Sequence, residues 1–409
     1  FADEKHISQI KKLGFEAAKG DKGVFVKSKD GSISIDITPS SIASMILEKA
    51  EGLAIGMIFE ESKKGESRAK DKSKGKEEDE QEMSYIGPVL KRYAYSTARV
   101  KAMESTLIKK EEIEKIINSK DQESIISILL QTDYKKELDQ LGGKEKGEIL
   151  DFALSKNLAS NVGKLITITP MEDKSITRAV LGKWDIYNIE LAIDAKARKA
   201  GFEEVSKYII DYGPYNMASL KEAYEEESVE GLISKMMINS PYKEMLSQAL
   251  EAYRKSNNAI QASITIDKLY YQKLGLLMPR IRSLSNGAAK IIKLDIDMKN
   301  ILMLMRSKKY NMPFNEIKDD FIPSGSIALE ELRLIYENSK NEEEVARSLK
   351  VFDLSKEAEL YKKEKRLFIF EIGMRNRIFK ESISVLSHTL LSFGTLLAYA
   401  YIKESEVLM

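Results

Sequence analysis

The chain has 409 residues, with 65 Lys+Arg against 64 Asp+Glu, so its formal net charge of +1 gives no general attraction to nucleic acid and we expect no nucleic-acid partner. Its length predicts two to four domains, and 43% hydrophobic residues are enough for real cores, which excludes disorder throughout. The absence of cysteine and the presence of only His6 and His388 exclude disulfides, thiolate catalysis and histidine-rich metal sites.

Residues 1–60 have the pattern of a small α/β fragment. Valine and isoleucine alternate with polar residues over 24–26 and 33–37, on either side of Asp30-Gly31, which predicts a β-hairpin around a tight turn. Apolar residues at helical spacing follow and predict a helix. Because about 60 residues are marginal for an independent core, we expect this fragment to need a partner or further chain.

A charged segment follows the fragment. Between Glu60 and Glu82, sixteen of twenty-three residues are charged, and the others are Ser, Gly, Ala and Gln. Such a composition has no apolar surface to bury, so it predicts a flexible linker over 61–83, with a charged interaction helix as the alternative. The chain begins at Phe1 and shows no basic-then-apolar signal sequence, and we therefore expect a cytoplasmic protein.

Residues 84–409 have apolar residues at i, i+3 and i+4 almost throughout, which predicts an all-α body. Helix starts are predicted at Ser175 and Ser219, the latter with Glu222 in a capping box. Helix breaks are predicted at Gly142-Gly143, Gly163, Pro170, Gly213-Pro214, Pro241, Pro279 and Pro323-Ser324-Gly325.

The body contains an internal repeat. At an offset of 112 residues the chain aligns with itself without a gap, and the matched pairs include Asn188/Asn300, Phe202/Phe314, Gly213/Gly325 and Tyr224/Tyr336. A fainter match at an offset of 108 pairs Tyr134 with Tyr242, and chance similarity between amphipathic helices remains an alternative for it. We infer three related helical subdomains of ordinary domain size, at about 84–183, 184–293 and 294–409.

Motifs of catalysis and cofactor binding are missing from the sequence. The nearest approach to a phosphate-binding loop, Gly142 to Gly147, is followed by Glu148 and lacks the required Lys and hydroxyl. No His-Glu-x-x-His, Gly-x-Ser-x-Gly or Gly-x-Gly-x-x-Gly motif is present. We expect the acidic runs at 225–227 and 342–344 to be solvated, and His388 to have no catalytic role. The sequence therefore predicts no catalytic residue, cofactor or metal.

One stretch has the length of a membrane span. Residues 383–402 carry no Asp, Glu, Lys or Arg over twenty positions, and Tyr399 and Tyr401 are of a type found at membrane interfaces. The stretch also contains three Ser, two Thr, one His and one Gly, which favours a helix buried in the body or facing a neighbouring protein.

Several segments together resemble a known family. They are Tyr93 to Met103, the Asp-x-x-Asn-Ile openings at 185–189 and 297–301, and the C-terminal residues 393–399 followed by 403–407. Their series is similar to the C subunits of archaeal A-type rotary ATPases, which are relatives of the vacuolar d subunits, over about residues 84 to 409. The family normally continues through a basic tail, so we expect the C-terminus at Met409 to be truncated.

The upstream fragment has a resemblance of its own. Lys22 to Val26, the Asp30-Gly31 turn, Thr38 and Ile58-Phe59 resemble the C-terminal end of the E subunits, which form part of the peripheral stalk of the same ATPase, although the family's Arg shortly after Thr38 is absent. A chain belonging to both stator and rotor would wind up. We therefore hypothesise that Met83 is the natural start and that residues 1–82 are the tail of a neighbouring reading frame; an intact mass of the full chain from rotating complexes would refute this.

The resemblance implies a non-catalytic connector of the central stalk. It would be a funnel of three pseudo-equivalent helical subdomains that seats the shaft, formed by D- and F-type subunits, on the proteolipid ring and transmits torque for proton- or sodium-coupled ATP synthesis or hydrolysis. It would lie peripherally on the cytoplasmic face of the cell membrane. Candidate shaft-facing residues of the cavity are Arg99, Asn188 and Asn300, with helix caps and core packing as the alternative roles.

Three other functions stay open at the level of sequence. The first is a soluble helical scaffold for another membrane or protein complex, the second a single-pass membrane protein anchored by residues 383–402, and the third an enzyme of unknown type.

Overall fold

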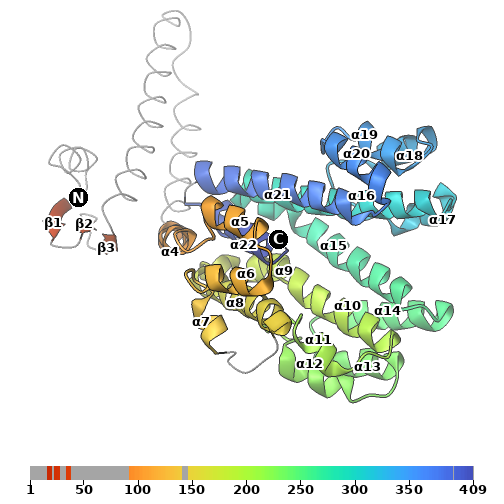
Figure 1. Ribbon diagram of the computed structural model, residues 1–409, viewed down its shortest axis with the longest axis horizontal. Helices are drawn as coiled ribbons and strands as arrows, with labels where there is room; N and C mark the ends of the chain where they lie inside the picture. The colour runs from red at the N-terminus through yellow and green to blue at the C-terminus, as the bar shows by residue number, and fades with distance from the viewer. Residues whose placement is uncertain are drawn as a thin grey trace, which may run out of the picture. The chain divides into compact units, whose positions relative to one another are not determined.

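The computed structural model describes residues 16–20, 23–27, 34–37, 92–140, 146–389 and 391–408 (Figure 1). Contacts divide the chain into two units, residues 1–89 and 90–409, and each is described by itself. Within the described residues the architecture is mainly α-helical.

The first unit contains a small antiparallel sheet. Its strands are β1 (Glu16–Gly20), β2 (Gly23–Lys27) and β3 (Ser34–Ile37), in the order β1-β2-β3. Val24 lies opposite Ile37 in the β2–β3 pair, so the two strands occupy the segments whose alternation predicts a hairpin; β1 was not predicted. The Asp30-Gly31 turn, the helix predicted after it and the linker over 61–83 lie outside the described residues.

The body begins with helices that span 94–168. They are α4 (Ala94–Glu104), α5 (Lys110–Ile117), α6 (Gln122–Leu129), α7 (Lys135–Asp139) and α8 (Lys146–Ile168). After the 3-10 helix η1 (Met171–Asp173) follow α9 (Lys174–Leu181), α10 (Lys183–Ala197), α11 (Phe202–Ser206), α12 (Met217–Tyr224), α13 (Val229–Met236), α14 (Lys243–Ser256) and α15 (Ala259–Leu284).

The remaining helices begin with α16–α21, which follow in the same order as α10–α15, and end with α22. They are α16 (Asn286–Lys309), α17 (Phe314–Ile317), the 3-10 helix η2 (Lys318–Asp320), α18 (Leu329–Asn338), α19 (Glu342–Ser348), α20 (Ser355–Glu364), α21 (Phe368–His388) and α22 (Phe393–Leu408).

Three of the predicted helix signals are wrong. Helix α12 is capped by Asn216, whose side chain accepts from the amides of Ala218 and Ser219, so Ser219 lies inside the first turn; an asparagine caps as well as a serine. Gly163 lies within α8, where the ring of Tyr212 packs at ordinary contact distance from the position a Cβ would take. Pro279 lies within the 26-residue helix α15, whose tertiary packing outweighs the lost hydrogen bond.

Side-chain contacts recur at the 112-residue offset. The Oδ1 atom of Asn188 accepts from the amide of Ile210, and that of Asn300 accepts from the amide of Ile322. Both side-chain amides also donate to the carbonyl of the same isoleucine, at 2.8 Å. Each asparagine therefore fixes the loop that follows its helix by satisfying both polar groups of one buried peptide residue.

The aromatic contacts obey the same offset. Phe202 packs on Tyr224 with ring centroids 5.5 Å apart, and the matched pair, Phe314 and Tyr336, at 5.7 Å. Both tyrosine hydroxyls donate to main-chain carbonyls at matched positions, those of Ala200 and Met312. The two segments thus share their internal architecture as well as sequence.

Glycine is required at the turn that both copies contain. Gly213 adopts φ 76°, and a Cβ there would lie 2.3 Å from Oδ1 of Asp185. The equivalent Gly325 faces Asp297 with the same 2.3 Å separation. A carboxylate one turn before the asparagine therefore needs a neighbour without a side chain.

The C-terminal helix α22 makes the corresponding contact with the first helices. Glu406 accepts from the amide of Ile108 through Oε1 and from the hydroxyl of Tyr134 through Oε2. Tyr242, which the fainter sequence match pairs with Tyr134, likewise donates its hydroxyl to a buried carboxylate, that of Asp185. Glu406 thus fixes the segments before α5 and α7 by hydrogen bonds, as Asn188 and Asp185 fix the segments before α12 and α14.

The apolar stretch 383–402 is not one helix. It contains the end of α21 and the beginning of α22, and from Phe393 to Ile402 the side chains are mostly buried in the body. In the part of the chain that the structure describes, none of the helices combines the length and apolar character needed to cross a membrane.

Candidate functional site

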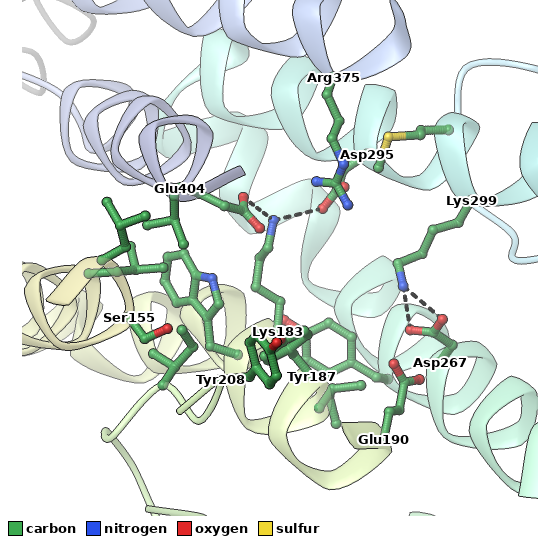
Figure 2. A pocket seen from close by; sticks show the side chains of 18 of the residues that line it. Ser155, Lys183, Tyr187, Glu190, Tyr208, Asp267, Asp295, Lys299, Arg375 and Glu404 are labelled. Atoms are coloured by element: carbon green, nitrogen blue, oxygen red, sulfur yellow. Dashed lines mark hydrogen bonds and ion pairs between the residues drawn. The ribbon is translucent and has the colours of Figure 1, made fainter. Parts of the chain in front are cut away.

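A cavity of about 300 Å³ lies among helices from distant parts of the body (Figure 2). Helices α8, α10, α15, α16, α21 and α22 all contribute side chains to its wall. The volume is at the lower end of the range of pockets that hold small ligands, so the cavity accommodates a side chain or a small molecule rather than a helix.

Residues at matched positions of three helices meet beside this cavity, and two of them, Lys183 and Asp295, line it. Lys183 opens α10, and Asp295 lies 112 residues later on α16; Nζ of Lys183 lies 3.4 Å from Oδ2 of Asp295. Tyr401 of α22 donates its hydroxyl to the same Oδ2 atom of Asp295 at 2.7 Å. Tyr401 lies five residues before Glu406, just as Lys183 lies five residues before Asn188. The ammonium of Lys183 also lies 3.9 Å from the centre of the Tyr401 ring. The repeated helices therefore converge through side chains that differ from copy to copy.

Further charges complete this cluster. Glu404 of α22 accepts from Lys183 at 2.7 Å, and Tyr271 of α15 donates to Asp295 at 3.0 Å. Burial alone would raise the pKa of Asp295, but the ammonium groups of Lys183 and Lys299 hold it below its ordinary value. The buried carboxylate is thus kept ionised by its surroundings.

A second ion pair stands on the other side of the cavity. Nζ of Lys299, from α16, lies 2.7 Å from both carboxylate oxygens of Asp267, from α15. Burial would lower the pKa of Lys299, but the carboxylates of Asp267 and Glu190 raise it above its ordinary value. This pair bridges two long helices across the wall of the cavity.

Glu190 is the carboxyl group that this network leaves unsatisfied. Figure 2 shows its side chain beside Asp267 and below Lys299. Its Oε1 atom is buried and has no hydrogen-bond partner. Burial and the nearby Asp267 carboxylate raise the pKa of Glu190 to about 8, with Lys299 acting in the opposite direction. Burial and the Asp267 carboxylate thus favour the protonated form of Glu190.

Arg99, Asn188 and Asn300, predicted from sequence to face a shaft cavity, do not line this cavity. Asn188 and Asn300 are buried in the loop contacts described above, and neither belongs to the wall of this cavity, although their helices α10 and α16 do. Arg99 is exposed on α4. The structure brings none of the three together, and their contact with a partner stays a prediction.

Sequence reasoning missed the charged wall, although a signal for it exists. Lys183 and Asp295 occupy matched positions five residues before the repeated asparagines, and Tyr187 and Lys299 occupy matched positions one residue before them. At these positions of the repeat-opening helices the charge of the side chain thus differs between the two copies. Positions that differ inside an otherwise repeated pattern would have indicated this site.

The wall of the cavity is rich in charged side chains. Over the described ranges, no group of three or more His, Asp or Glu residues is arranged to hold a metal ion. His388 lies exposed at the end of α21, where its Nδ1 atom is 2.8 Å from the carbonyl oxygen of Ser384. The cavity therefore offers a ligand charged side chains, and the carboxyl group of Glu190 can take up a proton or accept a hydrogen bond.

Comparison with known proteins identifies relatives of the body. A family model described as ATP synthase (C/AC39) subunit matches residues 96–409. The C subunit of the A-type ATP synthase of Thermoplasma acidophilum is 24% identical over 325 residues, which are 77% of this chain and 90% of that protein.

Two further relatives carry the same description. The C subunit of the A-type ATP synthase of Archaeoglobus fulgidus is 34% identical over 247 residues, which are 59% of this chain and 68% of the relative. The protein of that description from Thermococcus kodakarensis is 26% identical over 324 residues, covering 77% of this chain and 84% of the relative.

Proposed function

The chain belongs to the ATP synthase (C/AC39) subunit family as a C subunit of the A-type enzyme, a non-catalytic component of the rotary ATPase, and from this premise we propose that it seats the central shaft on the membrane rotor ring. Its partners in this role are the D- and F-type subunits of the shaft and the proteolipid ring. It lies on the cytoplasmic face of the membrane and is held there by those partners.

The observation that carries the proposal is the convergence of α10, α16 and α22 on one cavity. Lys183 and Asp295 line the cavity at matched positions, and Tyr401 of α22 donates to Asp295 from behind the wall. This arrangement supports a body of three related subdomains forming a funnel, with α22 completing the first of them. A connector of this kind gives one shaft a single receiving point while its outer faces present three similar subdomains to a symmetric ring.

Transmission of torque requires a wall that does not deform. The pairs Lys183–Glu404 and Lys299–Asp267 each link two helices around the cavity, and the core surrounding them is closely packed with Leu, Ile and Met. Because breaking a partly buried ion pair exposes or strands a charge, these links resist the sliding of one helix past another.

The three candidate residues have different parts in this proposal. The buried asparagines Asn188 and Asn300 support the connector as scaffold, since they fix the loops behind the cavity helices. Arg99 is available to a partner because its side chain is exposed on α4. The resemblance of residues 1–60 to the E subunits stays a prediction, and the family model begins after them, at residue 96.

The test is binding of the full chain to two purified fractions, the proteolipid ring and the D–F shaft subcomplex. We expect binding to both, with simultaneous occupancy. Arg99→Glu should weaken shaft binding, and more so at low salt, where the Debye length is longer. The matched control is Lys255→Glu on α14, an exposed charge reversal remote from α4.

Failure to bind either fraction would overturn the connector and favour a helical scaffold for another complex. Equal shaft affinity of both variants at all salt concentrations would remove Arg99 from the interface and leave the connector in place.

A further inference from the structure

The wall of the central cavity carries more negative than positive charge. Its carboxylates are Asp151, Glu190, Asp267, Asp295 and Glu404, and its cationic groups are Lys183, Lys299 and Arg375. Five acidic side chains therefore face three basic ones. The wall holds an excess of two negative charges when Glu190 is ionised and of one when Glu190 is protonated.

The basic side chains are already engaged. Lys183 contacts Glu404 at 2.7 Å and Asp295 at 3.4 Å, and Lys299 contacts both oxygens of Asp267. The guanidinium of Arg375 donates twice to Glu371, at 2.8 and 2.9 Å, outside the cavity wall. None of these cations makes a hydrogen bond to Oε1 of Glu190, which is buried without a partner.

We propose that this cavity binds a cationic group, an ammonium or guanidinium, which donates a hydrogen bond to Glu190. If the proposed function holds, the shaft presents this group as a lysine or arginine side chain. The volume of about 300 Å³ agrees with one long side chain entering the cavity while the rest of the partner stays outside.

A cation is the ligand that relieves the unsatisfied carboxyl group. A buried acceptor without a donor costs free energy, and a charged donor forms the stronger class of hydrogen bond with a carboxylate. An anion would add to the excess negative charge, and a neutral ligand would leave that excess uncompensated.

Binding of a cation should release a proton. The titratable and charged groups that line the cavity with Glu190 come from every helix of its wall and from the loop at Tyr208: Asp151 from α8, Lys183 and Tyr187 from α10, Tyr208, Asp267, Tyr270 and Tyr271 from α15, Asp295 and Lys299 from α16, Arg375 from α21 and Glu404 from α22. Burial and Asp267 raise the pKa of Glu190, whereas an arriving cation favours its ionised form, so a protonated Glu190 loses its proton to solvent as the ion pair forms.

Calorimetry of the full chain with the D–F shaft subcomplex tests this directly. At pH 7, titrations in two buffers of different ionisation enthalpy should reveal a release of protons on binding, and affinity should rise between pH 7 and pH 9. Glu190→Gln should abolish the proton release and weaken binding by about tenfold to a hundredfold.

Two variants keep the result interpretable. Glu251→Gln, the same charge change at an exposed position on α14, should behave as wild type. Glu190→Asp should retain proton release with reduced affinity, because it keeps the acid and shortens its reach. Equal affinity and equal proton release in wild type and Glu190→Gln would overturn the inference while leaving the shaft connector standing.

A second experiment distinguishes the two sources of the cation, a basic side chain of the shaft and a free amine. Agmatine should bind the free chain with proton release in the wild type and without it in Glu190→Gln, and butyrate should not bind. If the shaft subcomplex fails to bind, the connector proposal falls, and agmatine then decides the site alone. Proton release with agmatine would sustain a cation site for a free amine, and its absence would overturn it.

Discussion

The two repeated asparagines offer a quantitative test of how the body is built. Asn188→Ala removes three hydrogen bonds, to the amide and carbonyl of Ile210 and to the carbonyl of Tyr215. Asn300→Ala removes two, to the amide and carbonyl of Ile322. Since each buried polar group left without a partner costs about 1–3 kcal/mol, we expect each variant to lower the free energy of unfolding by roughly 3 kcal/mol.

Urea unfolding followed by circular dichroism measures the effect, with Asn338→Ala, an exposed position at the end of α18, as the control within about 0.5 kcal/mol. The two sites share no hydrogen-bond partner, so the double variant should lose about the sum. A loss below about 1 kcal/mol at either site, combined with weakened shaft binding, would refute the scaffold role and restore the direct contact predicted from sequence.

Three other substitutions test separate features. Gly213→Ala should cost about 2–4 kcal/mol in urea unfolding, because φ is positive and the new Cβ meets Asp185, whereas Gly201→Ala, which meets nothing within 4 Å, should cost less than about 0.5 kcal/mol. Burial raises the pKa of Asp185 to about 6, so its stabilising contribution is complete only below the unfolded pKa of about 4 and is lost as pH rises through 6. Asp185→Asn should remove about 2 kcal/mol of this pH dependence between pH 4 and pH 7, and an unchanged profile would contradict it. Lys403→Met leaves Glu406 without its 2.6 Å partner and should cost about 3 kcal/mol, with faster amide exchange in α4 and α8; unaltered exchange would show that α22 does not hold these helices.

The internal repeat shows what sequence could predict. Matching at an offset of 112 selected Asn188 and Asn300 correctly as equivalent, and their hydrogen bonds to residues 22 positions further on are the same in both copies. Repetition identifies what every copy needs, and every copy needs a fixed loop. It therefore found residues that fix these loops, and their contact with the shaft stays a prediction.

The cavity could not be derived in the same way. Glu190 has Leu302 as its match, and Lys183 has Asp295, so the side chains that give the wall its charge break the repeat. Their proximity depends on three helices meeting in space, with Tyr401 arriving from the far end of the chain. Local patterns contain no information about that meeting.

Helix boundaries failed where tertiary packing outweighs propensity. Pro279 removes one hydrogen bond from α15, but that helix buries residues along its length, including Tyr270, Tyr271 and Leu274. Gly163 is weak in an isolated helix and is retained in α8, where Tyr212 packs beside it. The packing that holds both positions in a helix comes from tertiary contacts, such as that of Tyr212 with Gly163, so rules based on the local sequence misjudged both positions.

The most direct test of the account is electron cryo-microscopy of the assembled A-type complex containing this chain. We expect the chain to lie between ring and shaft, with a basic side chain of the shaft entering the cavity between α10, α15 and α16 beside Glu190. A shaft bound to another face of the body, with the cavity remote from every neighbouring protein of the complex, would contradict it.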